Sequence, residues 1–461
     1  IKLFAPHGSP TYVLAARGFF AAEADDDLAL ALGRLSDLDP RNPELAAYRA
    51  KLLYRQGKRK EAREAMASLI KAGTMDSAIH YLAGLLELEG GRRKEALPHL
   101  ARALELEPGY PLYAFRHAEC LYLLGSPEAS EAIARARILA PTDGWTANLA
   151  AQAILARCQA RALPQGPEVV SGTEDPELAE ARALLEIARE ALPGEAAVRV
   201  NQAALEGLAG RTEAGLGILK GLADSGPARN EAGNLLAAAG RLEEAEKEYR
   251  AALALEPQSQ EYLCNLAATL LALERYSEAE ASLRKALDLE ESPRALLLAG
   301  NLALVYGEWV RAEAAYRLGL EKAPGDGALL LALGRTYLGV RKPKKAAECL
   351  DRLKNLDVAR ARLLESEILE ATTESLACAG CQRTWRIPRD LPAQSGASIR
   401  AMPPDDSPAG ACPRCGKIWC IACRKGELVD NRFTCPECGE ALKLSDNRLR
   451  YLVRIHLERE A

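Results

Sequence analysis

The chain is poor in aromatic residues, histidine and methionine, and it has no long apolar run. Aromatic side chains make up 5% of the 461 residues, with five histidines and three methionines. No apolar stretch reaches the ~18 residues that a membrane-spanning helix needs, and no secretory signal peptide is visible. These absences predict a cytoplasmic protein. The chain begins at Ile1 rather than Met, so a fragment that has lost an N-terminal membrane anchor is the alternative.

An excess of positive charge is also missing. Residues 1–375 carry 46 Lys and Arg against 54 Asp and Glu, and residues 376–445 carry ten against seven. Binding to nucleic-acid phosphates requires a basic footprint. Nucleic acid is therefore not expected as a partner.

Motifs for catalysis are absent too. The sequence has no phosphate-binding loop and no nucleophile elbow. The histidines are scattered along the chain, at His7, His80, His99, His117 and His456. We therefore predict that the protein is not an enzyme and has no catalytic residue.

What dominates the sequence instead is a repeat of 34 residues. Its clearest copy, 77–110, contains Ala83-Gly84, a Gly90-Gly91 turn and a terminal Pro108. Small residues at fixed positions let neighbouring helices approach closely, and proline cannot continue a helix. Further strong copies span 226–259, 260–293, 293–326 and 327–358, and weaker ones span 9–42, 43–76, 111–143, 144–193 and 195–227. One hairpin cannot bury its apolar face alone, so the period predicts stacked helical hairpins, with a loop at 164–176.

These residues resemble the tetratricopeptide repeat (TPR) family over about 9–358. The resemblance implies an all-α solenoid of about ten hairpins. In that family the first helix of each repeat, helix A, lines a groove that holds peptides or partner helices. The segment 358–375 is expected to form a capping helix.

Large aromatic and basic residues occupy the predicted groove positions of the first repeats. Such residues suit a protein or peptide partner that has apolar anchors and acidic groups. Packing between neighbouring repeats is the alternative role for each of them. The set is Arg17, Phe20, Lys51, Tyr54, Tyr81, Phe115 and Tyr122.

A second group of groove positions resembles the carboxylate clamp of co-chaperone TPR domains. Asn234, Asn265 and Arg294 match that pattern, whereas Asn230 and Leu298 replace its two other basic groups. The departures favour binding of an extended peptide backbone by the amides over capture of a carboxylate.

Eight of the twelve cysteines form four C-x2-C pairs near the C-terminus. Pairs at this spacing bind metal far more often than they form disulfides. Eight thiolates divide into two tetrahedral zinc sites with four ligands each, and iron–sulfur ligation is the alternative. The predicted ligands are Cys378, Cys381, Cys412, Cys415, Cys420, Cys423, Cys435 and Cys438.

The order of the pairs resembles the treble-clef module of FYVE and RING fingers. That resemblance implies a cross-brace, in which the first and third pairs share one metal and the second and fourth share the other. A double zinc ribbon, which joins the pairs sequentially, is the alternative. Ile387, Ile418 and Trp419 could supply the exposed apolar groove that a RING-type ligase needs.

Together these features predict a TPR solenoid at 1–357, a capping helix at 358–375, a two-zinc module at 376–445 and a C-terminal helix at 446–461. The predicted function is a scaffold that binds protein partners in its groove and uses the zinc module as a second docking site. The alternatives are a RING-like ubiquitin-type ligase and a zinc-ribbon nucleic-acid binder. The alanine-, arginine- and leucine-rich composition suggests a bacterial protein, and the sequence does not indicate its oligomeric state.

Overall fold

The structure is a computed structural model that describes residues 8–161, 175–391, 405–424, 428–429 and 432–460. Two compact units, Ile1–Pro257 and Gln258–Ala461, divide the chain. Most of the loop predicted at 164–176 lies outside the described residues. Within the described ranges, no helix is both long enough and apolar enough to cross a membrane.

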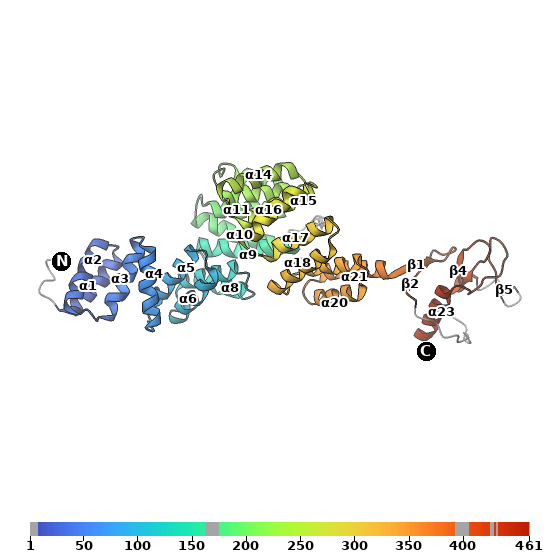
Figure 1. The fold of residues 1–461 in the computed structure, drawn as a ribbon, viewed down its shortest axis with the longest axis horizontal. Helices are drawn as coiled ribbons and strands as arrows, with labels where there is room; N and C mark the ends of the chain where they lie inside the picture. The colour runs from blue at the N-terminus through green and yellow to red at the C-terminus, as the bar shows by residue number, and fades with distance from the viewer. Residues whose placement is uncertain (1–7, 162–174, 392–404, 425–427, 430–431, 461) are drawn as a thin grey trace. The chain divides into compact units, whose positions relative to one another are not determined.

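The first unit is a series of helical hairpins (Figure 1), and its described residues form seven of them. Each odd-numbered helix is the helix A of a repeat, and it pairs with the even-numbered helix that follows. The helices are α1 (Ser9–Ala21), α2 (Asp25–Leu38), α3 (Pro43–Arg55), α4 (Arg59–Lys71), α5 (Ser77–Glu89), α6 (Arg93–Leu106), α7 (Pro111–Leu123), α8 (Ala129–Leu139), α9 (Gly144–Arg161), α10 (Pro176–Ala191), α11 (Ala196–Leu208), α12 (Thr212–Leu219), α13 (Gly226–Ala238) and α14 (Leu242–Leu255).

The second unit continues with three hairpins and one further helix. The helices are α15 (Gln260–Ala272), α16 (Tyr276–Leu289), α17 (Pro293–Val305), α18 (Trp309–Lys322), α19 (Gly327–Gly339), α20 (Pro343–Lys354) and α21 (Val358–Thr372). Helix α21 packs on α19 and α20, and its Leu364 is fully buried there. The predicted solenoid of about ten hairpins is confirmed.

Polar residues at fixed positions start many of the A helices. The side chain of Asp76 accepts hydrogen bonds from the backbone N–H groups of Ala78 and Ile79, and Asp326 caps α19 in the same way. These bonds satisfy N–H groups that have no partner within the helix. Asn42, Ser225, Ser259, Ser292 and Asp357 cap their helices similarly. The 34-residue repeat of the sequence therefore also sets the positions at which these helices begin.

In three of the strong repeats the glycine at the eighth position, Gly84, Gly233 or Gly300, lies under a large side chain of the second helix. A Cβ atom added to Gly84 would come within 2.7 Å of Leu100, and one added to Gly233 would come within 2.5 Å of Tyr249. Such distances are shorter than van der Waals contact, so these glycines are required for close helix packing.

The C-terminal part of the second unit contains three small antiparallel hairpins and two helices. Strand β1 (Thr373–Ala377) pairs with β2 (Thr384–Pro388), β3 (Pro408–Ala411) with β4 (Ile418–Cys420), and β5 (Leu428–Val429) with β6 (Arg432–Phe433). A short helix, α22 (Ile421–Arg424), follows β4, and α23 (Asn447–Glu460) ends the described chain. Helix α23 contacts β2 and β3, so it packs on the cysteine-bearing hairpins.

Candidate metal centres and partner-binding face

The first candidate metal centre joins the turn of the β1–β2 hairpin to the end of β4. Its four Sγ atoms, from Cys378, Cys381, Cys420 and Cys423, all lie within 4.8 Å of one another. Cys378 Sγ is 3.9 Å from Cys423 Sγ, and Cys381 Sγ is 3.6 Å from Cys420 Sγ. The backbone N–H of Ala379 donates to the carbonyl of Ile418 at 2.8 Å. This bond holds the two distant segments side by side.

The second candidate centre joins the turn of the β3–β4 hairpin to the segment after β6. It consists of Cys412, Cys415, Cys435 and Cys438, again with all four Sγ atoms within 4.8 Å of one another. Cys412 Sγ lies 3.4 Å from Cys438 Sγ, and Cys415 Sγ lies 3.7 Å from Cys435 Sγ. The structure thus groups the first pair with the third and the second with the fourth. This is the cross-brace arrangement and not the sequential one.

Backbone N–H groups point at the sulfurs and favour their thiolate forms. The N–H of Cys415, 3.5 Å from Cys412 Sγ, is the main reason that the pKa of Cys412 falls to about 6. Burial alone would raise the pKa of Cys378, but the N–H groups of Cys381, Cys420 and Gly380 outweigh it and bring that pKa to about 7. Hydrogen bonds donated to a thiolate stabilise it relative to the neutral thiol, and the pKa of the cysteine falls as a result.

Two other thiols, those of Cys420 and Cys438, ionise less easily. The pKa of Cys438 rises to about 12, chiefly because of its interaction with Cys412. Burial, followed by contacts within the group, raises the pKa of Cys420 to about 12. Four thiolates at such short separations need a cation between them, since metal ligation deprotonates cysteine outright.

The donor set and its spacing fit zinc. A tetrahedral site with Zn–S bonds of about 2.3 Å places its sulfurs about 3.8 Å apart. Five Sγ–Sγ distances within the two groups run from 3.4 to 3.9 Å. With four cysteines in each group, a bound ion would have no position open to water or substrate. A structural metal therefore suits these residues better than a catalytic one.

The apolar residues expected to form an exposed groove on this module lie instead in its interior. Ile387 is 0% exposed, and it packs in a cluster with Cys378, Cys420 and Leu452 of α23. Trp419 is 8% exposed and packs between Cys412 and Cys435, while Ile418 is half-buried. A module this small has few other apolar side chains with which to build a core, and these residues are needed there.

The predicted groove residues of the first repeats connect successive A helices. Arg17 of α1 forms an ion pair with Glu44 of α3 at 2.6 Å, and the Tyr54 hydroxyl of α3 donates to Glu89 of α5 at 2.9 Å. The ring of Tyr81 on α5 lies 4.9 Å from that of Tyr113 on α7. These residues serve in packing between repeats and yet retain exposed surface.

Two members of the predicted groove set are buried. Lys51 is 6% exposed, pairs with Asp76 at 2.6 Å and lies 4.9 Å from the centre of the Tyr48 ring. Phe115 is 7% exposed and belongs to the core around α7 and α9. Both side chains pack inside the repeats. Arg17 stays exposed, and Phe20, Tyr54, Tyr81 and Tyr122 stay partly exposed.

The three clamp-like residues are engaged within their own units. In the first unit, Asn234 accepts a hydrogen bond from the Tyr249 hydroxyl at 2.9 Å and donates one to Glu231 at 3.0 Å. In the second, Asn265 is 4% exposed and accepts a hydrogen bond from the Arg294 guanidinium. The hydrogen bond from Tyr249 to Asn234 has an equivalent in another repeat, where the Tyr316 hydroxyl donates to the side-chain amide oxygen of Asn301 at 2.8 Å. This recurrence indicates a repeat-internal packing role for that amide.

Sequence reasoning missed two groupings of side chains. His80 and His99 face each other across α5 and α6 with ring centres 6.3 Å apart. Burial, and then the neighbouring His80, lowers the pKa of His99. The 34-residue frame places them at unrelated positions, so only their packing reveals the pair.

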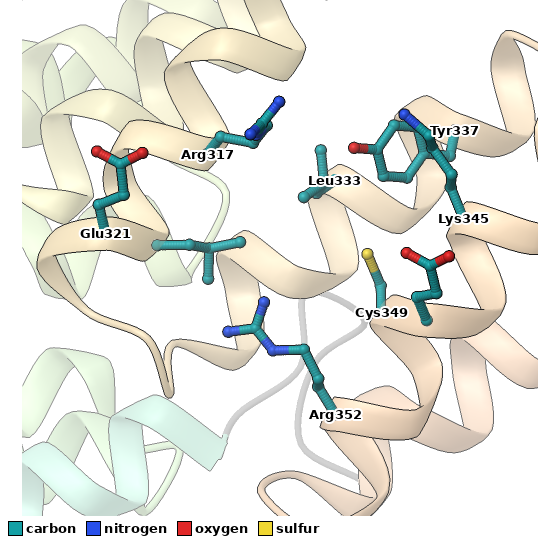
Figure 2. A pocket seen from close by; sticks show the side chains of 9 residues that line it. Arg317, Glu321, Leu333, Tyr337, Lys345, Cys349 and Arg352 are labelled. Carbon is teal, nitrogen blue, oxygen red and sulfur yellow. The ribbon is translucent and has the colours of Figure 1, made fainter.

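The second is a pocket of ≈ 460 Å³ between α18, α19 and α20 (Figure 2). Its floor is apolar, with Leu320, Leu333 and Cys349 buried. Its rim carries both signs of charge: Arg317, Lys345 and Arg352 against Glu321 and Glu348. Arg352 already donates to the carbonyl of Pro324 at 2.7 Å.

Known proteins resemble this chain mainly through its repeats. The tetratricopeptide-repeat family profile matches residues 48–111, 81–144, 230–290 and 264–327. A curated relative, the "TPR repeat-containing protein" of Treponema pallidum (strain Nichols), is 30% identical over 372 residues, which cover 78% of this chain and 45% of the relative. The chain thus spans less than half the length of that relative.

Solved structures with similar folds share little sequence with the chain. Human IFIT1, as a dimer with PPP-AAAA, is 17% identical with a TM-score of 0.44, covering 74% of this chain and 89% of that one. A thermophilic TPR protein of Thermus thermophilus, TTC0263, is 22% identical with a TM-score of 0.36, covering 42% and 100%. The hairpins within residues 48–144 and 230–327 are tetratricopeptide repeats, and they precede two groups of four cysteines that could each hold a zinc ion.

Proposed function

We propose that the protein is a non-catalytic scaffold that binds protein or peptide partners on the A helices of its first repeats. The observation that supports this most directly is a run of partly exposed aromatic side chains on successive A helices: Phe20 on α1, Tyr54 on α3, Tyr81 on α5 and Tyr122 on α7. Tyr110, just before α7, is 46% exposed and lies 4.5 Å from Tyr113. Exposed aromatic residues beside basic ones are typical anchors of protein interfaces.

The cysteine module is proposed to hold two structural zinc ions and to serve as a second docking site. Its support is the donor set, four cysteines per group, which offers no open coordination position for chemistry. Loss of the module should then change which partners bind without removing those held by the A helices.

A double variant, Tyr54→Ala/Tyr122→Ala, tests the partner-binding face. Truncating an aromatic anchor typically costs ~2 kcal/mol or more of binding, so partners recovered with the parent chain from the native organism should be lost. The matched control is Tyr276→Ala/Tyr306→Ala in later repeats, where the half-buried ring of Tyr276 and the exposed ring of Tyr306 lie 6.4 Å apart. Equal partner recovery by a folded Tyr54/Tyr122 variant and by the control would refute the proposed location.

A RING-like ligase remains the second candidate because the cysteines are grouped in the cross-brace arrangement. Against it stands the burial of Ile387 and Trp419, which removes the expected docking groove for a conjugating enzyme. A ubiquitin-discharge assay with the metal-loaded chain separates the two functions, since a scaffold would leave the conjugate intact.

A further inference from the structure

A second pocket, of ≈ 670 Å³, lies in the first unit between α3 and α4. Its walls are mostly apolar: Leu45 is buried, Leu53, Ala65 and Leu69 are half-buried, and Ala46 forms an exposed edge. Pro40, Pro43, Ala72 and Thr74 complete it at the open end of the hairpin, together with a few polar side chains. Pockets of this size with mostly apolar walls and a few polar groups are typical of small-molecule sites.

The polar groups of this pocket include two cations and no carboxylate. Arg41 and Arg49 are the charged residues that line it, and both are exposed. Within the described ranges, neither guanidinium has a hydrogen-bonding or ion-pairing partner.

The neighbouring carboxylates are already engaged elsewhere. Glu44 pairs with Arg17, and Asp76 pairs with Lys51. Asp39 accepts hydrogen bonds from Ser9 and from Asn42. These three carboxylates are therefore not the partners of Arg41 and Arg49.

This pocket is separate from the proposed partner-binding face. Arg49 and Lys51 are two residues apart on α3, so their side chains leave the helix on roughly opposite sides. Lys51 belongs with Tyr54 to the contacts between A helices, whereas Arg49 and Leu53 face the pocket. A ligand bound in the pocket would leave the A-helix face uncovered.

We propose that the α3–α4 pocket binds an amphipathic anion, an apolar chain that ends in a carboxylate. The chain would lie along Leu45, Leu53 and Leu69, and the carboxylate would accept hydrogen bonds from Arg41 and Arg49. A guanidinium offers donors in a planar fork that matches a carboxylate. From Pro43 to Leu53, which both line the pocket, helix α3 rises about 15 Å, which is long enough for an extended chain of medium length. The mixed charges of the pocket in Figure 2 offer no comparable preference for an anion.

Calorimetry of the full chain with dodecanoate, kept below the concentration at which it forms micelles, tests the proposal. Saturable binding near one molecule per chain is expected. Dodecyltrimethylammonium, which has the same tail and the opposite charge, should bind at least tenfold more weakly. The double variant Arg41→Gln/Arg49→Gln should weaken dodecanoate binding by roughly tenfold or more, because it removes charge-assisted hydrogen bonds.

Two further variants make the result decisive. Ala46→Trp fills the pocket from its exposed edge and should abolish binding of dodecanoate without disturbing the core. The variant Arg317→Gln/Arg352→Gln, in the pocket between α18, α19 and α20, should leave dodecanoate binding unchanged. Equal affinity for the two amphiphiles, or unchanged dodecanoate binding by both the Arg41/Arg49 variant and Ala46→Trp, would overturn the proposal.

Discussion

Single side chains at recurring positions explain why the repeats pack so closely. The aromatic ring of Tyr249 covers Gly233, and Tyr316 covers Gly300 in the same way. The hydroxyl groups of both tyrosines bind the amide of an asparagine in the first helix of the same repeat. A glycine, an asparagine and a tyrosine therefore act as one packing unit that recurs 67 residues later, from Tyr249 to Tyr316.

The variant Gly233→Ala tests this unit. An added methyl group would clash with the Tyr249 ring, so we expect a loss of about 1–3 kcal/mol in the free energy of unfolding. The control is Gly33→Ala in α2, where an added Cβ meets no atom within 4 Å. Alanine favours a helix over glycine, and the control should gain about 0.5–1 kcal/mol. Urea unfolding monitored by circular dichroism measures the free energy of unfolding of both variants. Equal changes in the two variants would contradict the packing role of Gly233.

Tyr337 predicts a dependence of stability on pH in the alkaline range. Burial, with a hydrogen bond to Glu313 as the second cause, raises the pKa of Tyr337 from 10.0 to about 12. The unfolded chain then loses this proton at lower pH than the folded chain does. The stabilising contribution is complete below about pH 10 and disappears as the pH rises toward 12.

The variant Tyr337→Phe removes this titration. Its urea midpoint should decline less than that of the parent chain between pH 9 and pH 11. Parallel declines of the two midpoints would show that Tyr337 is not responsible.

At the scale of elements, the cysteine module consists of short hairpins that hold little core of their own. Its strands have two to five residues each. Among the residues that the structure describes, the buried partners of Cys378 in its apolar cluster are Trp385, Ile387, Cys420 and Leu452. Modules of this size usually need metal to fold, and the free energy of metal binding is then free energy of folding.

Purified protein is therefore expected to contain two zinc ions per chain by elemental analysis. The variant Cys412→Ser/Cys415→Ser should retain one, and limited proteolysis should then cut the module while the helical circular dichroism persists. Cys158→Ser, a half-buried cysteine of α9, is the matched control and should keep both ions. Mainly iron in the parent chain, or two ions in the double variant, would contradict this assignment.

At the scale of the whole molecule, each hairpin is stabilised chiefly by its neighbours in sequence, as in other repeat proteins. Helix α21 closes the last hairpin of the second unit, where Ala361 and Leu364 are buried beside α19 and α20. The module begins directly after it, and Arg389 at the end of β2 donates to the carbonyls of Glu370, Thr372 and Thr373.

A chain that ends at Thr373 should therefore keep its folded repeats. It loses the hydrogen bonds from Arg389 but none of the buried apolar contacts of α21, so its helical circular dichroism and its unfolding midpoint should change little. A chain that ends at Asn355 also loses α21, whose Ala361 and Leu364 are buried beside α19 and α20, and it should unfold at lower urea concentration. Loss of cooperative unfolding in the longer of the two chains would show that the repeats depend on the module.

The number of hairpins, their boundaries and all eight candidate metal ligands follow from the sequence alone. These features are local: a repeat is encoded by capping residues, small residues and turns within 34 positions, and a C-x2-C pair lies within one turn. The contact that brings Cys378 beside Cys420, through the hydrogen bond from the Ala379 N–H to the Ile418 carbonyl, is not local. The sequence therefore left two groupings of the cysteines open.

The accessibility of the candidate side chains depends on the folded packing and could not be predicted from the sequence. Lys51 and Phe115 occupy groove positions in the repeat pattern, yet neighbouring helices bury them, and Ile387 and Trp419 are buried in the module core. The α3–α4 pocket likewise combines residues from Pro40 to Thr74 that show no common motif. Exposure depends on what packs against a residue from elsewhere in the chain, and periodicity carries no information about that contact.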